Sequence, residues 1–201
     1  MFITLEGIDG SGKSSQAKML VKLLCEAGKK TLWTHEPGDW EQGKVVRSIL
    51  LNGELKHPFT EVLLFLADRC EHVKQVIVPA LREKQYVVCD RYNDSTLAYQ
   101  CWGHGVDRLK VESLIHWCEL PVPDITFWLD LPVETAIKRR VGRGGQDRIE
   151  GEDISFHENV AEGFRALAKE NPSRICRIDA LESPSGVKEQ ILSELKKRGI
   201  L

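Results

Sequence analysis

The chain has 201 residues, a formal net charge of −2, and ordinary globular fractions of hydrophobic (42%) and charged (29%) residues. This length suits one domain with a sizeable core, and the near-neutral charge excludes bulk attraction to nucleic acid or to an anionic membrane. The sequence has no apolar run long enough to span a membrane and no signal-peptide pattern at its N-terminus. The cysteines and histidines follow no zinc or disulfide spacing, so we expect a reduced, cytoplasmic protein.

The first residues carry the strongest motif. A short apolar strand, Phe2–Glu6, runs into a glycine-rich turn that fits the phosphate-binding pattern G-x-x-x-x-G-K-[ST]. Glycines let successive backbone N–H groups point inward, and the following helix aims its N-terminus at the same spot. A strand before and an amphipathic helix after make a chance match improbable, so the motif predicts a nucleoside triphosphate site. Its expected nucleotide-binding residues are Gly7, Ile8, Asp9, Gly10, Ser11, Gly12, Lys13, Ser14 and Ser15.

Strand and helix signals alternate along the chain. This alternation predicts an α/β fold with a mainly parallel sheet covered on both faces, and ligands gathered at the carboxyl ends of the strands. After Phe2–Glu6, the expected strands are Lys30–Thr34, Tyr86–Asp90, Ile125–Leu131 and Arg174–Ile178. Helices are expected after Lys13 and near 41–51, 60–83 (with a possible kink at Pro79), 108–118, 133–141, 155–169 and 185–197.

Asp90 and Arg91 end the third expected strand. If that strand neighbours the first, Asp90 would lie beside the phosphate loop, where it and Ser14 would hold Mg²⁺, and Arg91 would bring a forked donor to phosphate oxygens. The alternative is a surface Asp-Arg pair at the end of a strand.

The segment from Lys138 to Arg148 is basic and rich in glycine. Glycines would destabilise a solvated helix face, whereas a flap that closes over phosphates needs both charge and flexibility. A nucleic-acid-binding loop is the alternative, which the whole-chain charge disfavours. We therefore expect a single domain, 1–201, with a mobile lid at about 140–152.

Several blocks together resemble one family. Asp90-Arg91-Tyr92, Ser95 and Ala98-Tyr99-Gln100 resemble the D-R-[YFH]-x-x-S-x-x-A-Y-Q run of thymidylate kinases. The blocks at 5–10, 36–38, 65–69 and 147–150 resemble the same family, so the resemblance covers about three-quarters of the chain. Glycine at Gly10, together with arginines in the lid, is similar to the bacterial type.

The resemblance implies a P-loop nucleoside-monophosphate kinase fold, with strand order 2-3-1-4-5 and a small lid. It implies Mg²⁺-dependent transfer of the ATP γ-phosphoryl group to dTMP by a homodimer. The catalytic residues would be Lys13, Arg91, Arg143 and Asp9, with Arg139 near the adenine and Arg148 beside Arg143 over the transferring group. The substrate would be held by Asp9, Glu36, Arg47, Phe65, Arg69, Arg91, Ser95, Tyr99 and Gln100.

The implied roles at the acceptor are specific. Phe65 would stack on thymine, Arg69 and Gln100 would bond to its edge, and Tyr99 would exclude a ribonucleotide. Ser95 would lie near the 5-methyl group, and Arg47 and Arg91 would hold the acceptor phosphate with support from Glu36. Without the family pattern, Phe65 could be core, and Arg47 and Arg69 could be ordinary surface residues.

The chain departs from the family in two segments. It has His35-Glu36-Pro37-Gly38-Asp39-Trp40 where Arg-Glu-Pro-Gly-Gly-Thr is usual, and Cys101-Trp102-Gly103-His104-Gly105 where a glycine-rich, arginine-containing segment is usual. Because histidine is only partly charged near neutral pH, His35 predicts weaker or more pH-sensitive acceptor binding.

Two other classes stay open. One is another P-loop kinase, acting on a different nucleotide or on a deoxynucleoside; a nucleoside kinase would need a base for a neutral hydroxyl, for which Glu36 is the candidate. A nucleotide-binding switch protein is the third hypothesis, but the guanine-reading N-K-x-D element is absent from the sequence.

Overall fold

The computed structural model describes residues 1–141 and 148–201. Its centre is a parallel five-stranded sheet in the order β2-β3-β1-β4-β5, which confirms the predicted fold class and strand order. The strands lie within one residue of the expected bounds at each end: β1 Phe2–Glu6, β2 Thr31–His35, β3 Tyr86–Asp90, β4 Ile125–Asp130 and β5 Ile175–Asp179.

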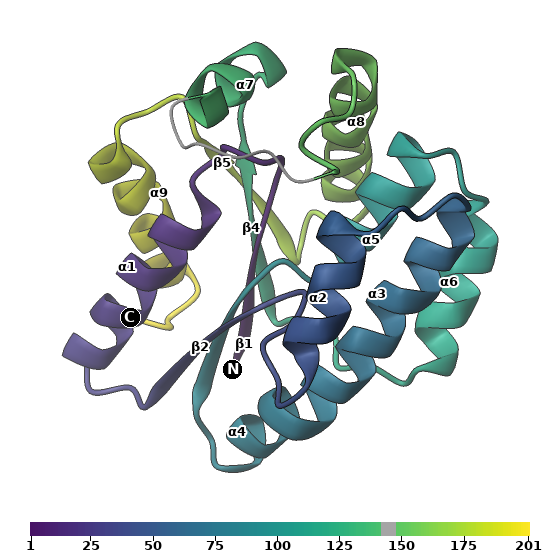
Figure 1. The fold of residues 1–201 in the computed structure, drawn as a ribbon. Coiled ribbons are helices and arrows are strands. Elements are labelled where there is room, and N and C mark those ends of the chain that lie inside the picture. The colour runs from purple at the N-terminus through teal and green to yellow at the C-terminus, as the bar shows by residue number, and fades with distance from the viewer. Residues whose placement is uncertain (142–147) are drawn as a thin grey trace.

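Helices cover both faces of this sheet. Figure 1 shows α1 and α9 on one side and α3, α6 and α8 on the other. None of the described helices is long and apolar enough to cross a membrane. The helices are α1 Lys13–Glu26, α2 Gly43–Asn52, α3 Pro58–His72, η1 Val73–Ile77, α4 Val78–Arg82, α5 Asn93–Thr96, η2 Leu97–Gly103, α6 Arg108–Trp117, α7 Val133–Val141, α8 Ile154–Glu170 and α9 Pro184–Lys197.

The long helix predicted at 60–83 runs from Pro58 to Arg82, and its irregularity is a π-helical turn at Val73–Ile77. Pro79 lacks an N–H group, and its ring crowds the carbonyl of the residue four positions earlier. That residue is Gln75, which lies inside the π-helical turn. The irregularity therefore lies about one turn before Pro79, where the sequence predicted a kink.

The sequence did not predict the helical segment Asn93–Gly103, formed by α5 and η2. Residues 94–100 are all buried, because this segment packs among α3, α6 and α8. A helix covered on every side has no polar stripe, so periodicity cannot reveal it.

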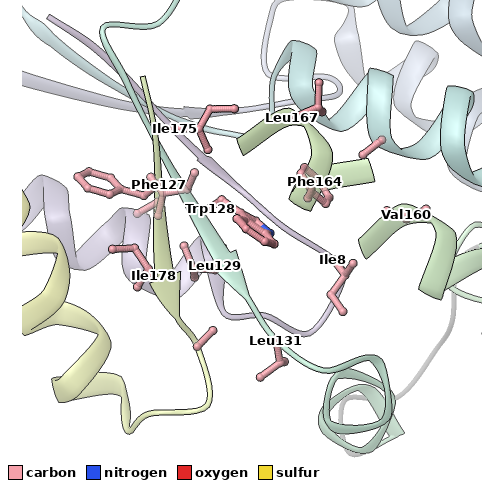
Figure 2. Close-up of a cluster of buried hydrophobic side chains, with 14 of the residues drawn as sticks. Ile8, Phe127, Trp128, Leu129, Leu131, Val160, Phe164, Leu167, Ile175 and Ile178 are labelled. Carbon is pink, nitrogen blue, oxygen red and sulfur yellow. The ribbon is translucent and has the colours of Figure 1, made fainter. Parts of the chain in front are cut away.

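The main core fixes the central strands on both faces. Along β4, Trp128 points toward Phe164 of α8, while Phe127 and Leu129 lie on the opposite face (Figure 2). All four side chains are buried. This alternation holds β4 and its neighbour β1 rigidly, and the phosphate loop follows β1 directly.

Candidate active site

The phosphate loop joins β1 to α1 and depends on glycine. Gly7, Gly10 and Gly12 have φ of 138°, 89° and 96°, conformations that side chains rarely adopt. A Cβ atom on Gly7 would lie 2.6 Å from the Leu129 carbonyl oxygen, and one on Gly10 would lie 2.6 Å from that of Ala136. The loop is therefore packed against the ends of β4 and α7 as well as shaped by its own backbone.

Lys13 is buried at the start of α1, and its Nζ donates a hydrogen bond to the Ile8 carbonyl at 2.9 Å. Burial, and next the charge of Arg91, lower the pKa of this ammonium to about 8, although Asp9, Asp90 and Glu6 oppose the change. A phosphate group would supply the negative charge that this ammonium lacks.

Ser14 and Asp90 meet because β3 is the neighbour of β1. The Ser14 Oγ donates to the Asp90 Oδ2 at 2.5 Å. A hydroxyl and a carboxylate oxygen are the hard donors that Mg²⁺ prefers, so the predicted metal residues fit that ion.

Arg91 links the phosphate loop to the second cavity. It has φ of 73° and donates to the Gly7 carbonyl at 3.2 Å, to Ser95 Oγ at 3.0 Å, to Tyr99 OH at 3.1 Å and to the Asp9 carboxylate. Burial raises the pKa of Asp9, but the charges of Arg91 and Lys13 and the Tyr99 hydrogen bond lower it overall. Asp9 is therefore ionised and fixes the guanidinium.

Two adjoining cavities lie at the carboxyl ends of the strands. One, of about 360 Å³, follows the phosphate loop and includes Lys13, Ser14, His35 and Asp90. The other, of about 100 Å³, is the acceptor cavity. It is lined by Asp9, Glu36, Pro37, Arg47, Leu51, Phe65, Arg69, Arg91, Ser95, Thr96, Tyr99, Gln100 and Ile149. All nine residues expected to bind the acceptor are among them.

Gln100 has both amide atoms buried and without a hydrogen-bond partner. A buried amide that loses both its donor and its acceptor interactions with water costs free energy unless a ligand replaces them. Its position in the acceptor cavity therefore marks where a polar ring edge would bind, beside the apolar face of Phe65.

Arg69 and Glu36 form a buried pair in the same wall. The Arg69 Nε donates to Glu36 Oε2 at 2.6 Å, and its terminal nitrogens bond to Asn93 and Thr96 side chains and the Tyr92 carbonyl. Four of the five N–H groups are thus used. The predicted contact with the base edge would use the fifth.

Arg47, on α2, lines both cavities and donates to the Pro37 carbonyl at 2.7 Å. His35 reaches only the phosphate-loop cavity, where its buried Nδ1 has no hydrogen-bond partner and its ring lies 5.5 Å from that of Trp33. Its contact with an acceptor phosphate stays a prediction.

The structure accounts for Trp40 and His104. The Trp40 indole donates to Asp68 Oδ1 at 2.7 Å, and the other Asp68 oxygen accepts from the Gly38 N–H at 3.0 Å. His104 lies 3.5 Å from Glu61, and its ring is tilted by 43° to that of Phe156, with the ring centroids 4.6 Å apart.

The predicted lid arginines differ in where they lie. Arg148 pairs with buried Glu61 at 2.9 Å and donates to the Leu50 carbonyl at 3.2 Å, so here it lies on the acceptor side. Arg139 donates to the Ala180 carbonyl after β5 at 3.1 Å. Arg143 lies within 142–147, the part of the lid outside the described residues.

Sequence reasoning missed Glu6, His72 and Glu61 as parts of the site. Glu6 accepts from the Tyr92 N–H at 2.8 Å and from Ser95 Oγ at 2.5 Å, and burial raises its pKa to about 8. An acidic residue closing a buried strand was the only signal in the sequence.

A phosphate loop on a 2-3-1-4-5 sheet, with cationic side chains between a phosphate cavity and an acceptor cavity, defines the class of P-loop nucleotide kinases. The thymidylate kinase family model matches residues 5–191, and the chain belongs to this family of phosphotransferases.

The relatives agree over the whole chain. The chain is 47% identical over 199 residues to the thymidylate kinase of Synechococcus sp. (strain JA-2-3B'a(2-13)), covering 98% of this chain and 95% of that one. It is 41% identical to that of Acinetobacter baumannii (strain AYE), over 97% and 100% of the two chains. The crystal structure of the thymidylate kinase from Ehrlichia chaffeensis aligns with a TM-score of 0.81 at 34% identity, covering 98% of both chains.

Proposed function

We propose that the chain transfers the γ-phosphoryl group of ATP to dTMP, giving dTDP and ADP. Thymidylate kinases use ATP as the phosphate donor, generally with Mg²⁺. The observation that carries the choice of acceptor is the unpartnered amide of Gln100 in the acceptor cavity. The thymine edge, with one N–H and one carbonyl, would satisfy both ends of that amide, whereas a single sugar hydroxyl cannot reach both of its ends.

The other acceptor residues follow the same arrangement. Phe65 supplies an apolar face for the base, and Arg69 a further donor to its edge. The Tyr99 hydroxyl donates to Asp9 Oδ2 at 2.7 Å, and we expect this fixed ring to exclude a 2′-hydroxyl. Ser95 borders the 5-methyl group.

The reaction relies on charge and positioning. The acceptor phosphate is already ionised, so no general base is needed and in-line placement of the two phosphates dominates. Lys13, Arg91 and Arg47 gather negative charge between the cavities, and Arg143 and Arg148 of the lid would add to it. Ser14 and Asp90 would hold Mg²⁺, which would neutralise phosphate charge when bound.

The structure disfavours a kinase that acts on a nucleoside hydroxyl. Its base would be Glu36, but one oxygen of that carboxylate accepts from Arg69 and the other contacts His72 at 2.9 Å. A carboxylate held between two fully buried partners is a poor proton acceptor.

Three further features belong to the proposal. The lid at 140–152 closes over the phosphates, the protein works as a homodimer, and it resides in the cytoplasm. Exposed apolar side chains on α2, α3 and α6 support the dimer, and six free thiols support a reducing compartment.

The test is ADP release with ATP and Mg²⁺ for dTMP, dUMP, AMP, CMP, GMP and thymidine. We expect a strong preference for dTMP. Gln100→Leu should raise the KM for dTMP about 100-fold because it leaves the base edge unpaired. The exposed Gln75→Leu is the control and should leave it unchanged. Faster turnover with thymidine than with dTMP would overturn the proposal.

A further inference from the structure

Four polar side chains form a continuous chain behind the acceptor cavity. Asp39 Oδ2 accepts from Thr34 Oγ1 at 2.7 Å, Thr34 Oγ1 lies 2.6 Å from His72 Nε2, and His72 Nδ1 lies 2.9 Å from Glu36 Oε1. Thr34 and His72 have no exposed surface. Each of the three contacts therefore needs one proton, and that proton must come from one of these four side chains.

Counting these protons fixes the state of the ring. Ionised Glu36 and Asp39 can only accept, and the hydroxyl of Thr34 has one proton, which it gives to Asp39. Thr34 must then accept from His72 Nε2, and Glu36 must accept from His72 Nδ1. We infer that His72 is held as an imidazolium and serves as a positioning residue that, together with Arg69, fixes Glu36 in the wall of the acceptor cavity.

The surrounding charges favour this state. Glu36, Asp39 and Asp68 lie around the network, with Arg69 as the opposing cation, so a second cation brings the cluster nearer to balance. Cys89 Sγ lies close to Glu36 and His72, which suggests a metal-binding trio. However, both Glu36 oxygens and both ring nitrogens already have partners, and the thiol donates to the Arg91 carbonyl at 3.1 Å. A proton fills this role instead.

The consequence for the proposed reaction is positional. Glu36 begins the segment whose Pro37 carbonyl holds Arg47, and Arg47 faces both cavities. When Glu36 is held in one position, it positions Arg69 through their hydrogen bond and Arg47 through the adjoining Pro37 carbonyl. Loss of the imidazolium should weaken acceptor binding more than it slows the chemical step.

Nitrogen-15 NMR of the free protein at neutral pH tests the charge directly. We expect both ring nitrogens of His72 to be protonated, with His72→Gln assigning the signal and exposed His116 as the reference. Thr34→Ser should keep this state. Thr34→Val should return one nitrogen to the unprotonated form. An unprotonated nitrogen in the wild-type ring, or a ring that stays doubly protonated in Thr34→Val, would overturn the inference.

The kinetic arm rests on the proposed reaction, whereas the spectroscopic arm does not. His72→Gln should raise the KM for dTMP about tenfold, with smaller changes in kcat and in the KM for ATP, and His116→Gln should change none of them. An equal loss in every parameter would mean a general structural role. Absence of any activity toward dTMP would remove the proposed function, and the NMR result would still decide the state of His72.

Discussion

Lys13 is a buried ammonium that lacks a full counter-charge until phosphate arrives. Its pKa of about 8, against an ordinary 10.5, is lowered first by burial and then by Arg91. Bound ATP should raise it again. At about pH 9 the free protein has lost this proton and the complex has regained it, so ATP binding should take up a proton and weaken as the pH rises.

Calorimetry of ATP binding in two buffers with different ionisation enthalpies measures this uptake. Lys13→Arg is the matched control, because arginine stays charged at this pH and should show no uptake. Equal heats for the wild type in both buffers would show that Lys13 keeps its proton without phosphate.

Single residues also differ in whether their roles could be predicted from the sequence. The lysine and serine of the phosphate loop were predictable because their chemistry depends on local spacing. The roles of Trp40 and His104 were not, since their partners, Asp68 and Glu61, lie on α3, far away in the chain.

At the scale of elements, Glu61 joins α3 to Arg148, in the second half of the predicted lid. Burial raises its pKa, but the hydrogen bonds and charges of His104 and Arg148 lower it overall, so it is ionised at neutral pH. Glu61→Gln should release Arg148, and with it the neighbouring Ile149, which lines the acceptor cavity. We expect the KM for dTMP to rise about tenfold, measured by ADP release.

Glu71→Gln, on an exposed position of the same helix, is the control and should behave as the wild type. If the contact between the two side chains is responsible, Arg148→Met should add little to Glu61→Gln. Full additivity of the two changes would argue against it.

The helices divide by how they are packed. Surface helices such as α9 have one apolar stripe and were predicted within one or two residues of their bounds. Within the Asn93–Gly103 segment, residues 94–100 are all buried. The residues there that form one wall of the acceptor cavity were therefore foreseen through the family resemblance rather than as a helix.

At the scale of the whole molecule, exposed apolar side chains lie on α2, α3 and α6. These three helices lie together on one side (Figure 1). Leu63 is 49% and Trp117 80% exposed. We expect this face to be the homodimer interface, so Leu63→Glu should give a monomer in light scattering coupled to size exclusion.

Leu181→Glu is the matched control, since Leu181 is 54% exposed but follows β5, away from these helices. It should leave the mass unchanged. A wild-type protein that is monomeric at all accessible concentrations, or a dimer that survives Leu63→Glu, would contradict this choice of face.

The sequence by itself determined the phosphate loop, the alternation of strands and helices and, through the order of its motif blocks, the family. These are properties of local spacing and of periodicity, which neighbouring residues set. The tertiary structure decided what depends on packing between distant segments: the unpartnered amide of Gln100, the turn of Arg148 toward Glu61, and the proton count around His72. Burial and the position of distant partners control each of these, and no short stretch of sequence records them.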